Sequence, residues 1–134
     1  MDFNNTNIAS GIITLAHEDS RRIISEFNSN EGDFAVKHFL VKEQLPLGNH
    51  YHTKKTEVFI VLKGQGILRS CPIDKATGKP IGDVETKELD NKSVVAVPAY
   101  VAHTFTFEPG SEVLCFSSKA FNEEDKDMVP YPLM

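Results

Sequence analysis

Hydrophobic and polar residues alternate in short segments along most of the chain, and turn-forming residues separate these segments. Alternation with a period of two places successive side chains on opposite faces of a β-strand. No segment shows a convincing helical repeat over the usual length of a helix. Many short strands of this kind indicate an all-β sandwich or barrel. The pattern predicts strands over 12–16, 22–27, 34–42, 57–63, 66–71, 84–89, 93–97, 102–108 and 112–117.

Turn-forming residues set the expected organisation of the chain. Gly64-Gln65-Gly66 predicts a tight hairpin, and residues 74–80 predict a longer exposed loop. The acidic run 123–127 predicts a solvated turn or short helix, followed by an extended arm. A chain of 134 residues can bury one sound core but is too short for two. We therefore expect one domain over 1–134, with an N-terminal arm and leading hairpin over 1–33, a barrel core over 34–117 and a C-terminal tail over 118–134.

The composition is that of an ordinary soluble globular protein, with 40% hydrophobic and 25% charged residues. A net charge of −5 argues against nucleic acid as a partner, because phosphate binding normally requires a basic face. No stretch approaches the ~18 apolar residues of a membrane-spanning helix, and the first residues lack the regions of a signal peptide. We therefore expect a cytoplasmic protein that binds no membrane, in which Cys71 and Cys115 are reduced and buried.

Four good metal ligands, His50, His52, Glu57 and His103, occur at a spacing that lets them converge inside one barrel. On a strand His50 and His52 point the same way, whereas Glu57 has the wrong parity to share their face. The polar residues 53–56 must therefore turn, so that Glu57 begins a new strand. His103 alternates with two phenylalanines further along and can face the same interior. Three imidazoles and a carboxylate suit Zn, Fe, Mn, Ni or Cu, with coordination positions left open for catalysis.

The two blocks of this pattern resemble the signature of the cupins, a superfamily of double-stranded β-helices or jelly-roll barrels. The first block is His50-Tyr51-His52, then Glu57, then six residues and Gly64; the second is Pro98 followed by His103. Within cupins, the text from Gly48 to Phe59 is similar to the domains of capsular-polysaccharide enzymes that epimerise 4-keto nucleotide sugars. This resemblance implies that His50, His52, Glu57 and His103 hold one zinc ion, while the donor set by itself leaves Fe, Mn or Ni as alternatives. A second resemblance, to nucleotide-sugar 3,4-ketoisomerases, implies that the histidines act as acid and base without a metal.

The sequence departs from the cupin pattern at four positions. Gln44 stands where a glycine is expected before the first block, and Lys92 and Tyr100 stand where the second block usually has glycines. Phe107 replaces an asparagine that often follows the histidine of the second block. Tyr100 could donate a proton at the cavity mouth, or it could be a loop aromatic that fills space.

Epimerising a keto-sugar means removing a proton next to a carbonyl and stabilising the resulting enolate, which requires an acid/base pair and an electrophile. The catalytic candidates near the motif are Tyr51, Tyr100, His38 and Lys37. The candidates for binding a sugar nucleotide are Arg69 and Lys54, and the cations Lys55, Arg21 and Arg22 are also available.

We expect the chain to act on a nucleotide-linked keto-sugar in surface-polysaccharide synthesis as an epimerase or isomerase. An iron-dependent cupin oxygenase and a non-catalytic sugar-binding or sensor module remain alternatives. A small β-roll also leaves exposed sheet edges, which a partner strand or arm would cover. We therefore expect a homodimer, with the segment before Gly11 as the covering arm.

Overall fold

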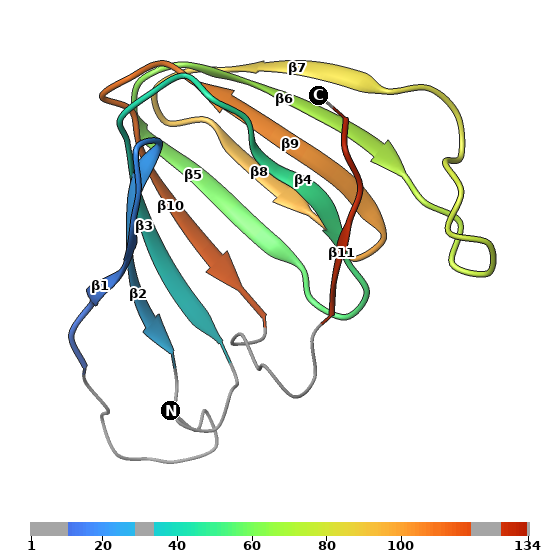
Figure 1. The fold of residues 1–134 in the computed structure, drawn as a ribbon, viewed down its shortest axis with the longest axis horizontal. Helices are drawn as coiled ribbons and strands as arrows, with labels where there is room; N and C mark the ends of the chain where they lie inside the picture. Colours follow the sequence, from blue (N-terminus) through green and yellow to red (C-terminus); the bar gives the residue numbers. More distant parts are fainter. Residues whose placement is uncertain (1–10, 29–33, 119–126, 134) are drawn as a thin grey trace.

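The structure is a computed structural model that describes residues 11–28, 34–118 and 127–133. These residues contain strands and no helix, and the strands form two antiparallel sheets (Figure 1). The first sheet has the order β1-β2-β3-β10-β5-β8, and the second has the order β11-β4-β9-β6-β7. The strands are β1 (Thr14–Glu18), β2 (Arg22–Asn28), β3 (Ala35–Val41), β4 (Leu47–His52), β5 (Glu57–Lys63), β6 (Gly66–Pro72), β7 (Glu85–Leu89), β8 (Val94–Val97), β9 (Val101–Phe107), β10 (Glu112–Ser117) and β11 (Met128–Pro130).

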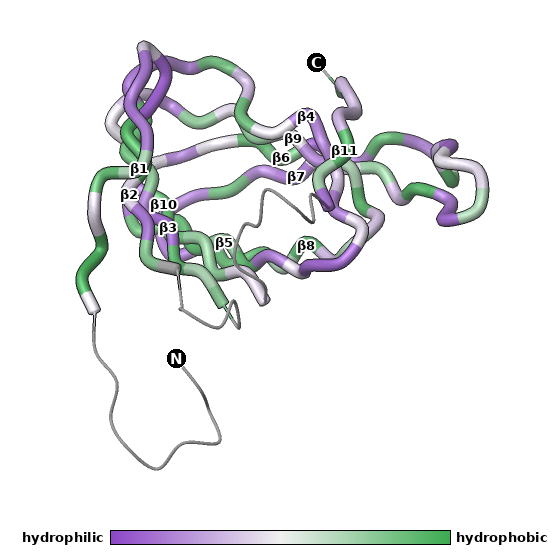
Figure 2. The backbone as a smooth tube through the Cα atoms, turned by 60° about the horizontal axis from the view of Figure 1, so that its bottom comes forward, coloured by the Kyte–Doolittle hydropathy of each residue, from purple (hydrophilic) through white to green (hydrophobic). Residues whose placement is uncertain are grey.

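The two sheets face each other as the layers of a jelly roll, with the core between them (Figure 2). The core contains inward-facing residues of both sheets, and its aromatic part includes Phe59, Phe105 and Phe107. The rings of Phe59 and Phe105 lie 4.5 Å apart between centroids, although β5 and β9 belong to different sheets. The all-β cupin-type fold predicted from the alternating pattern is therefore confirmed.

Two strands, β4 and β11, are absent from the set predicted by alternation. β11 is the extended arm of the prediction, and it forms a strand because it pairs with β4 along Met128 to Pro130. The predicted hairpin at residues 64–66 is wrong. β5 pairs with β8 and β10, whereas β6 pairs with β7 and β9, so the chain crosses there from one sheet to the other. The turn signal was correct, but glycine reports a change of direction and not which strands pair.

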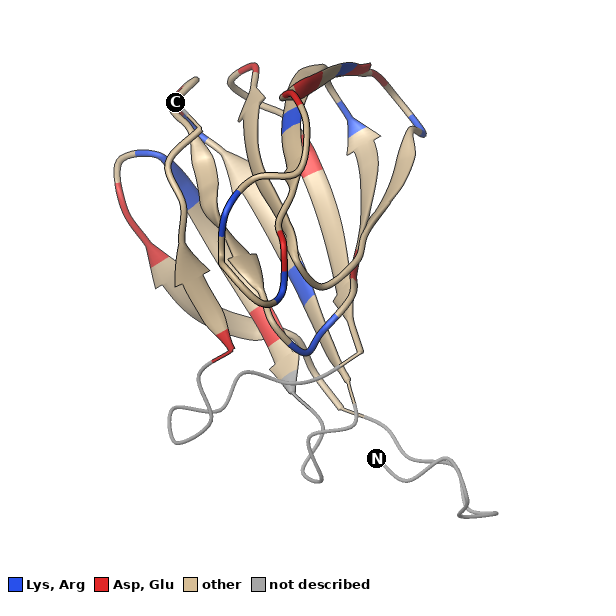
Figure 3. Cartoon of the chain, turned by 90° about the vertical axis from the view of Figure 1, so that its right-hand side faces the viewer, with Lys and Arg blue, Asp and Glu red and all other residues tan. Residues whose placement is uncertain are grey.

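Some predictions fall on residues outside the described ranges. The segment before Gly11, predicted to be the covering arm, is one of these, and so are residues 119–126 of the predicted tail. No helix in the described ranges has the length and hydropathy needed to cross a bilayer. Acidic and basic residues are intermixed along the loops and strand ends, as Figure 3 shows from one side. Cys71 and Cys115 are buried and free, as predicted.

Candidate metal centre

The pairing of β4 with β9 brings His50 opposite His103. The register shifts between Gly48 and His50, where Gly48 has a φ of 117° and Asn49 a φ of 57°. A Cβ atom on Gly48 would lie 2.8 Å from the backbone oxygen of His103, so a side chain there would require the strands to move apart. This irregular step sets the direction of His50, and the rings of His50 and His103 lie 4.8 Å apart between centroids.

Glu57 reaches the same point from the other sheet. β4 ends at His52 and β5 begins at Glu57, so the chain turns through residues 53–56 as the parity of the sequence required. Glu57 Oε1 lies 3.0 Å from His52 Nε2 and 3.6 Å from His103 Nε2. One donor atom from each of His50, His52, Glu57 and His103 lies within 4.8 Å of the others. The structure therefore brings together all four predicted ligands.

Two of the histidines are fixed by partners on the outer side of their rings. His52 Nδ1 lies 3.1 Å from Asp127 Oδ1, and His103 Nδ1 lies 3.0 Å from the backbone oxygen of Val101. Both partners are acceptors, so each Nδ1 carries a hydrogen and donates it. In the neutral imidazole, each Nε2 then presents a lone pair toward Glu57. This arrangement of outer carboxylate or carbonyl, histidine and inner lone pair is typical of metal-binding histidines.

The inner atoms lack hydrogen-bond partners. His52 Nε2 and Glu57 Oε1 are buried, and neither makes a hydrogen bond within the described part of the chain. Their separation of 3.0 Å brings an imidazole lone pair close to a carboxylate oxygen, which is unfavourable unless a proton or a metal cation lies between them. The second oxygen of Glu57 accepts a hydrogen bond from the buried thiol of Cys115 at 3.5 Å. The donor set therefore fits a divalent transition metal, with one oxygen of Glu57 directed at it.

The electrostatics of the site favour the protonation states that bind metal. Burial, assisted by repulsion from the other two histidines, lowers the pKa of His50 to about 3. Burial is also the main reason that the pKa of His103 is lowered. Burial alone would raise the pKa of Glu57, but His52, when a proton lies on its Nε2, and the nearby positive charge of Lys55 lower it to about 2, so a cation beside this carboxylate keeps it ionised. His50 and His103 are thus neutral and Glu57 is ionised at neutral pH.

The four residues line a cavity of about 230 Å³ between the sheets. Its other walls are mainly aromatic and aliphatic, with a few charged side chains. The lining consists of Arg22, Ile24, Lys37, Phe39, Leu47, Gly48, His50, His52, Lys55, Glu57, Phe59, His103, Phe105, Phe107, Val113, Asp127 and Met128.

Of the four predicted catalytic residues, Lys37 lines this cavity. His38 is the next residue on β3 and points to the other face, where its Nε2 lies 3.5 Å from Glu112 Oε2. Tyr51 and Tyr100 stack on each other with ring centroids 5.9 Å apart, in a second cluster that includes Tyr131. His38, Tyr51 and Tyr100 are not among the cavity-lining residues, so the geometry gives no support to their predicted roles.

The predicted substrate-binding residues Arg69 and Lys54 also lie outside the lining. Arg69 alternates with the buried Leu68 on β6, and Lys54 is exposed in the turn after β4. Lys55, the neighbouring cation, lines the cavity instead and is only 4% exposed. Composition cannot decide which of two adjacent lysines in a turn points inward.

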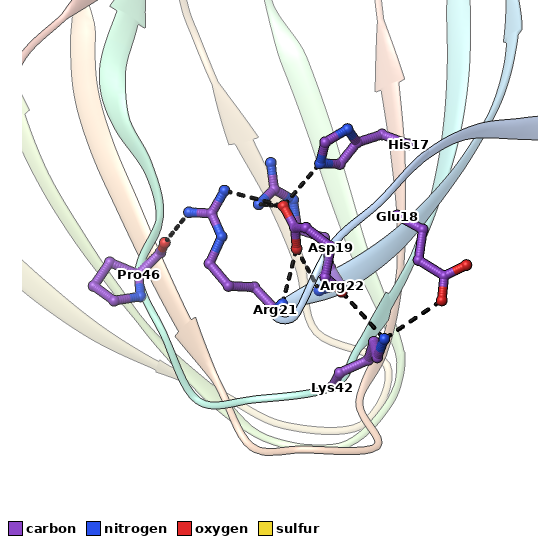
Figure 4. A network of polar contacts seen from close by, with 7 residues as sticks. All are labelled: His17, Glu18, Asp19, Arg21, Arg22, Lys42 and Pro46. Atoms are coloured by element: carbon purple, nitrogen blue, oxygen red, sulfur yellow. Dashed lines mark hydrogen bonds and ion pairs between the residues drawn. The ribbon is translucent and has the colours of Figure 1, made fainter.

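Arg22 is a further cation in the lining, and a network at the turn between β1 and β2 holds it (Figure 4). Asp19 Oδ2 lies 3.1 Å from Arg22 Nη1, and Asp19 Oδ1 accepts hydrogen bonds from the backbone N–H groups of Arg21 and Arg22. Burial is the main reason that the pKa of Arg22 is lowered, and the Asp19 carboxylate opposes this effect. Asp19 therefore fixes the direction of the arginine.

Sequence reasoning missed Asp127, which lies in a stretch that we predicted to be a solvated turn. Its Oδ1 accepts the hydrogen bond from His52, and its Oδ2 accepts hydrogen bonds from the backbone N–H groups of Lys54 and Lys55 at 3.3 and 3.1 Å. Asp127 thus ties the end of the chain to the turn that carries the metal ligands. The signal that could have found it is an acidic residue just before an extended segment, which is too common to be decisive.

The fold and the four-residue centre together define a cupin domain. The chain belongs to the polysaccharide biosynthesis C-terminal domain family, whose family model matches residues 17–129. No curated protein matches the chain by sequence.

Several solved structures have the same fold as this chain. The capsular polysaccharide assembling protein CapF from Staphylococcus aureus matches with 19% identity and a TM-score of 0.72, over 92% of this chain and 33% of CapF. The chain therefore spans about a third of the length of CapF. The QdtA 3,4-ketoisomerase from Thermoanaerobacterium thermosaccharolyticum, in complex with TDP, matches with 24% identity and a TM-score of 0.56, over 71% of this chain and 64% of QdtA. Streptomyces PAC13 with uridine matches with 13% identity and a TM-score of 0.62, over 92% of this chain and 93% of PAC13.

Proposed function

We propose that this cupin domain epimerises or isomerises a nucleotide-linked keto-sugar in surface-polysaccharide biosynthesis, and that His50, His52, Glu57 and His103 hold one zinc ion. The observation that carries the proposal is the pair of buried acceptors at the centre. His52 Nε2 and Glu57 Oε1 lie 3.0 Å apart without a hydrogen bond in the described structure. This geometry supports a cation-binding centre more directly than a pair of histidines that exchange protons with a substrate.

The reaction removes a proton from the carbon next to a carbonyl group. A divalent metal at the centre would supply Lewis acidity that polarises the carbonyl oxygen. The residues of this chain hold the sugar and exclude water from the reacting carbon, because the walls around the four ligands are largely aromatic and aliphatic. Lys37, which faces the same cavity, can as the free amine take the proton from this carbon and, as the ammonium so formed, return it to the enolate.

The family and the neighbouring folds support the choice of substrate. The family is named for polysaccharide biosynthesis, and CapF is a capsular polysaccharide assembling protein. QdtA is a 3,4-ketoisomerase whose structure was solved in complex with TDP. A cavity of about 230 Å³ is smaller than the roughly 300 to 1,000 Å³ of pockets that enclose drug-sized ligands. We therefore place the sugar ring in the cavity and the nucleotide at its mouth.

Solvent exchange tests the reaction. Incubating the zinc-loaded protein with 4-keto-6-deoxy nucleotide sugars in D₂O should place deuterium on the carbon next to the carbonyl group, even where little net product accumulates. Glu57→Gln should slow this exchange, since the carboxylate charge helps to hold the cation. If none of these sugars exchanges and the iron-loaded protein consumes O₂ with any substrate, the protein is an oxygenase and the proposal is wrong.

We further propose that the protein is a cytoplasmic homodimer. β1 is an edge strand of its sheet, and Leu15 on this strand and Ile12 just before it are 64% and 79% exposed. Apolar side chains on a sheet edge favour burial against a second copy. Light scattering at micromolar concentration should give the mass of a dimer, and a clean monomer mass would contradict this proposal.

A further inference from the structure

Lys55 is a buried cation whose charge acts on Glu57 and Asp127 from a distance, without an ion pair in the described structure. Its side chain lines the cavity beside the metal ligands, and the residue is only 4% exposed. Its backbone N–H donates to Asp127, but no ion pair or hydrogen bond of its ammonium group occurs with any residue in the described ranges. Burial removes the hydration of an ammonium group, and the loss is fully compensated only where a counter-charge contacts that group directly. The buried ammonium group of Lys55 is therefore positioned to bind a negatively charged ligand in the cavity.

Lys37 brings a second positive charge to the same cavity. It lies on β3 directly opposite Cys115 of β10, whose thiol contacts Glu57. Burial raises the pKa of Cys115, while Lys37 and Lys55 both act against this increase, so both lysines lie within electrostatic range of the same thiol. Like Lys55, Lys37 makes no ion pair with any residue that the structure describes.

Three of the four oxygens of the two carboxylates that line the cavity already accept hydrogen bonds. The oxygens of Asp127 bind His52 and the backbone N–H groups of residues 54 and 55. One oxygen of Glu57 accepts the Cys115 hydrogen bond, and the other faces the histidines. A divalent ion held by one carboxylate and neutral imidazoles would keep a net positive charge, which adds to the charges of the two lysines. The loaded cavity would therefore be electropositive and would favour an anion.

We propose that Lys55 and Lys37 form an anion-binding pair beside the metal centre, and that they hold the negatively charged oxygen of a sugar enolate. The identity of the ligand rests on the proposed function, whereas the binding of a small anion does not. Lys55 is the main contact because it is the more buried of the two lysines, and hydrogen bonds to a charged oxygen are strongest where water is excluded. Lys37 supplies the second charge.

Acetate, a small anion, is the probe for the first test. Calorimetric titration of the zinc-loaded wild type should show acetate binding, and Lys55→Met should weaken it by about tenfold or more. Lys37→Met should weaken it by a smaller factor. Lys87→Met, at an exposed position on β7, should leave it unchanged. All variants should keep the zinc content of the wild type. Unchanged acetate binding in Lys55→Met, at full zinc content, would overturn the proposal.

Thermal unfolding separates a ligand-binding lysine from a structural one. If Lys55 serves a ligand, Lys55→Met removes an unpaired buried charge and should raise the Tm of the zinc-loaded protein. If Lys55 supports the fold, the same substitution should lower the Tm, and the proposal is wrong.

Solvent exchange of the keto-sugar in D₂O links the pair to the reaction. Lys55→Met should reduce the exchange rate by about a hundredfold or more, and Lys55→Arg should restore part of it. Acetate binding that depends on Lys55, together with an absence of exchange in the wild type, would overturn the enolate as the ligand and the proposed function while leaving the anion site intact. Exchange that is unaffected by Lys55→Met would overturn the enolate role of the lysine alone.

Discussion

At the residue scale, the direction of each metal ligand depends on an outer partner. His52 shows this most clearly, because Asp127 accepts a hydrogen bond from one ring nitrogen and Glu57 lies beside the other. Cys115 supports Glu57 in a similar way, because its thiol donates a hydrogen bond to the carboxylate oxygen that faces away from the centre. The four ligands were predictable from their spacing. Their outer partners were not, because hydrogen bonds between residues far apart in sequence leave no local pattern.

Asp127→Asn should lower the metal affinity of the protein. The amide oxygen can still accept the hydrogen bond from His52. The substitution removes the negative charge, however, which orients the ring and makes its other nitrogen a stronger metal ligand. Loss of such an outer partner typically costs about 10 to 100-fold in metal affinity. Competition with a zinc-binding dye would measure the change. Asp83→Asn, at an exposed loop position, is the matched control and should bind zinc like the wild type. Equal affinities for both variants would show that Asp127 does not support the centre.

At the element scale, the turns carry the irregular conformations that the sites require. Lys92 and Tyr100 stand where cupins usually have glycines, and both have left-handed backbone conformations, with φ of 69° and 61°. The cupin pattern therefore indicated the location of both turns, although neither turn has the glycine that would fit this conformation best. Alternation predicted the bounds of β5 and β10 correctly, as Glu57–Lys63 and Glu112–Ser117. It failed for β4, because the step at Gly48 and Asn49 interrupts the regular period.

Lys92→Gly should stabilise the protein. A residue with a Cβ atom in the left-handed region costs roughly 1–2 kcal/mol, part of which the greater freedom of glycine in the unfolded chain offsets. We expect the free energy of unfolding to increase by about 0.5 to 1 kcal/mol in urea titrations. The control is Lys87→Gly, which places glycine in β7 and should decrease the same free energy. A decrease in Lys92→Gly would show that the lysine side chain contributes more than its backbone costs.

At the scale of the whole molecule, the jelly roll brings β4, β5 and β9 to one point, although these strands are spread over half of the chain. The fold class followed from the short alternating segments, and the centre followed from two blocks with the right parity. The sequence did not predict which charged side chains enter the cavity. Lys55 and Arg22 line it, whereas their neighbours of the same type, Lys54 and Arg21, do not. Only the packing of the fold decides between such neighbours.

The metal-free protein should lose stability in acid. The pKa of His50 is about 3 in the folded state, against 6.5 for a histidine in an unfolded chain, and the pKa of His103 is also lowered. Between these values the unfolded state binds more protons, so the free energy of unfolding decreases as the pH falls from about 6.5 toward 3. The slope approaches about 1.4 kcal/mol per pH unit for each histidine. Urea titrations at pH 7.5 and 5 should show this loss, and His50→Gln should reduce it. Equal stability at both pH values would contradict neutral, buried histidines.

Metal stoichiometry tests the central claim most directly. Protein purified without a histidine tag or chelator, then equilibrated with zinc and desalted, should carry about one equivalent of zinc by elemental analysis, as expected for one His₃Glu centre. His103→Ala should lose most of this zinc, because the substitution removes a buried ligand. His38→Ala, which removes a histidine from the opposite face of β3, should retain it. A wild-type protein that binds no Zn, Fe, Mn or Ni under titration would contradict the metal centre and the mechanism built on it.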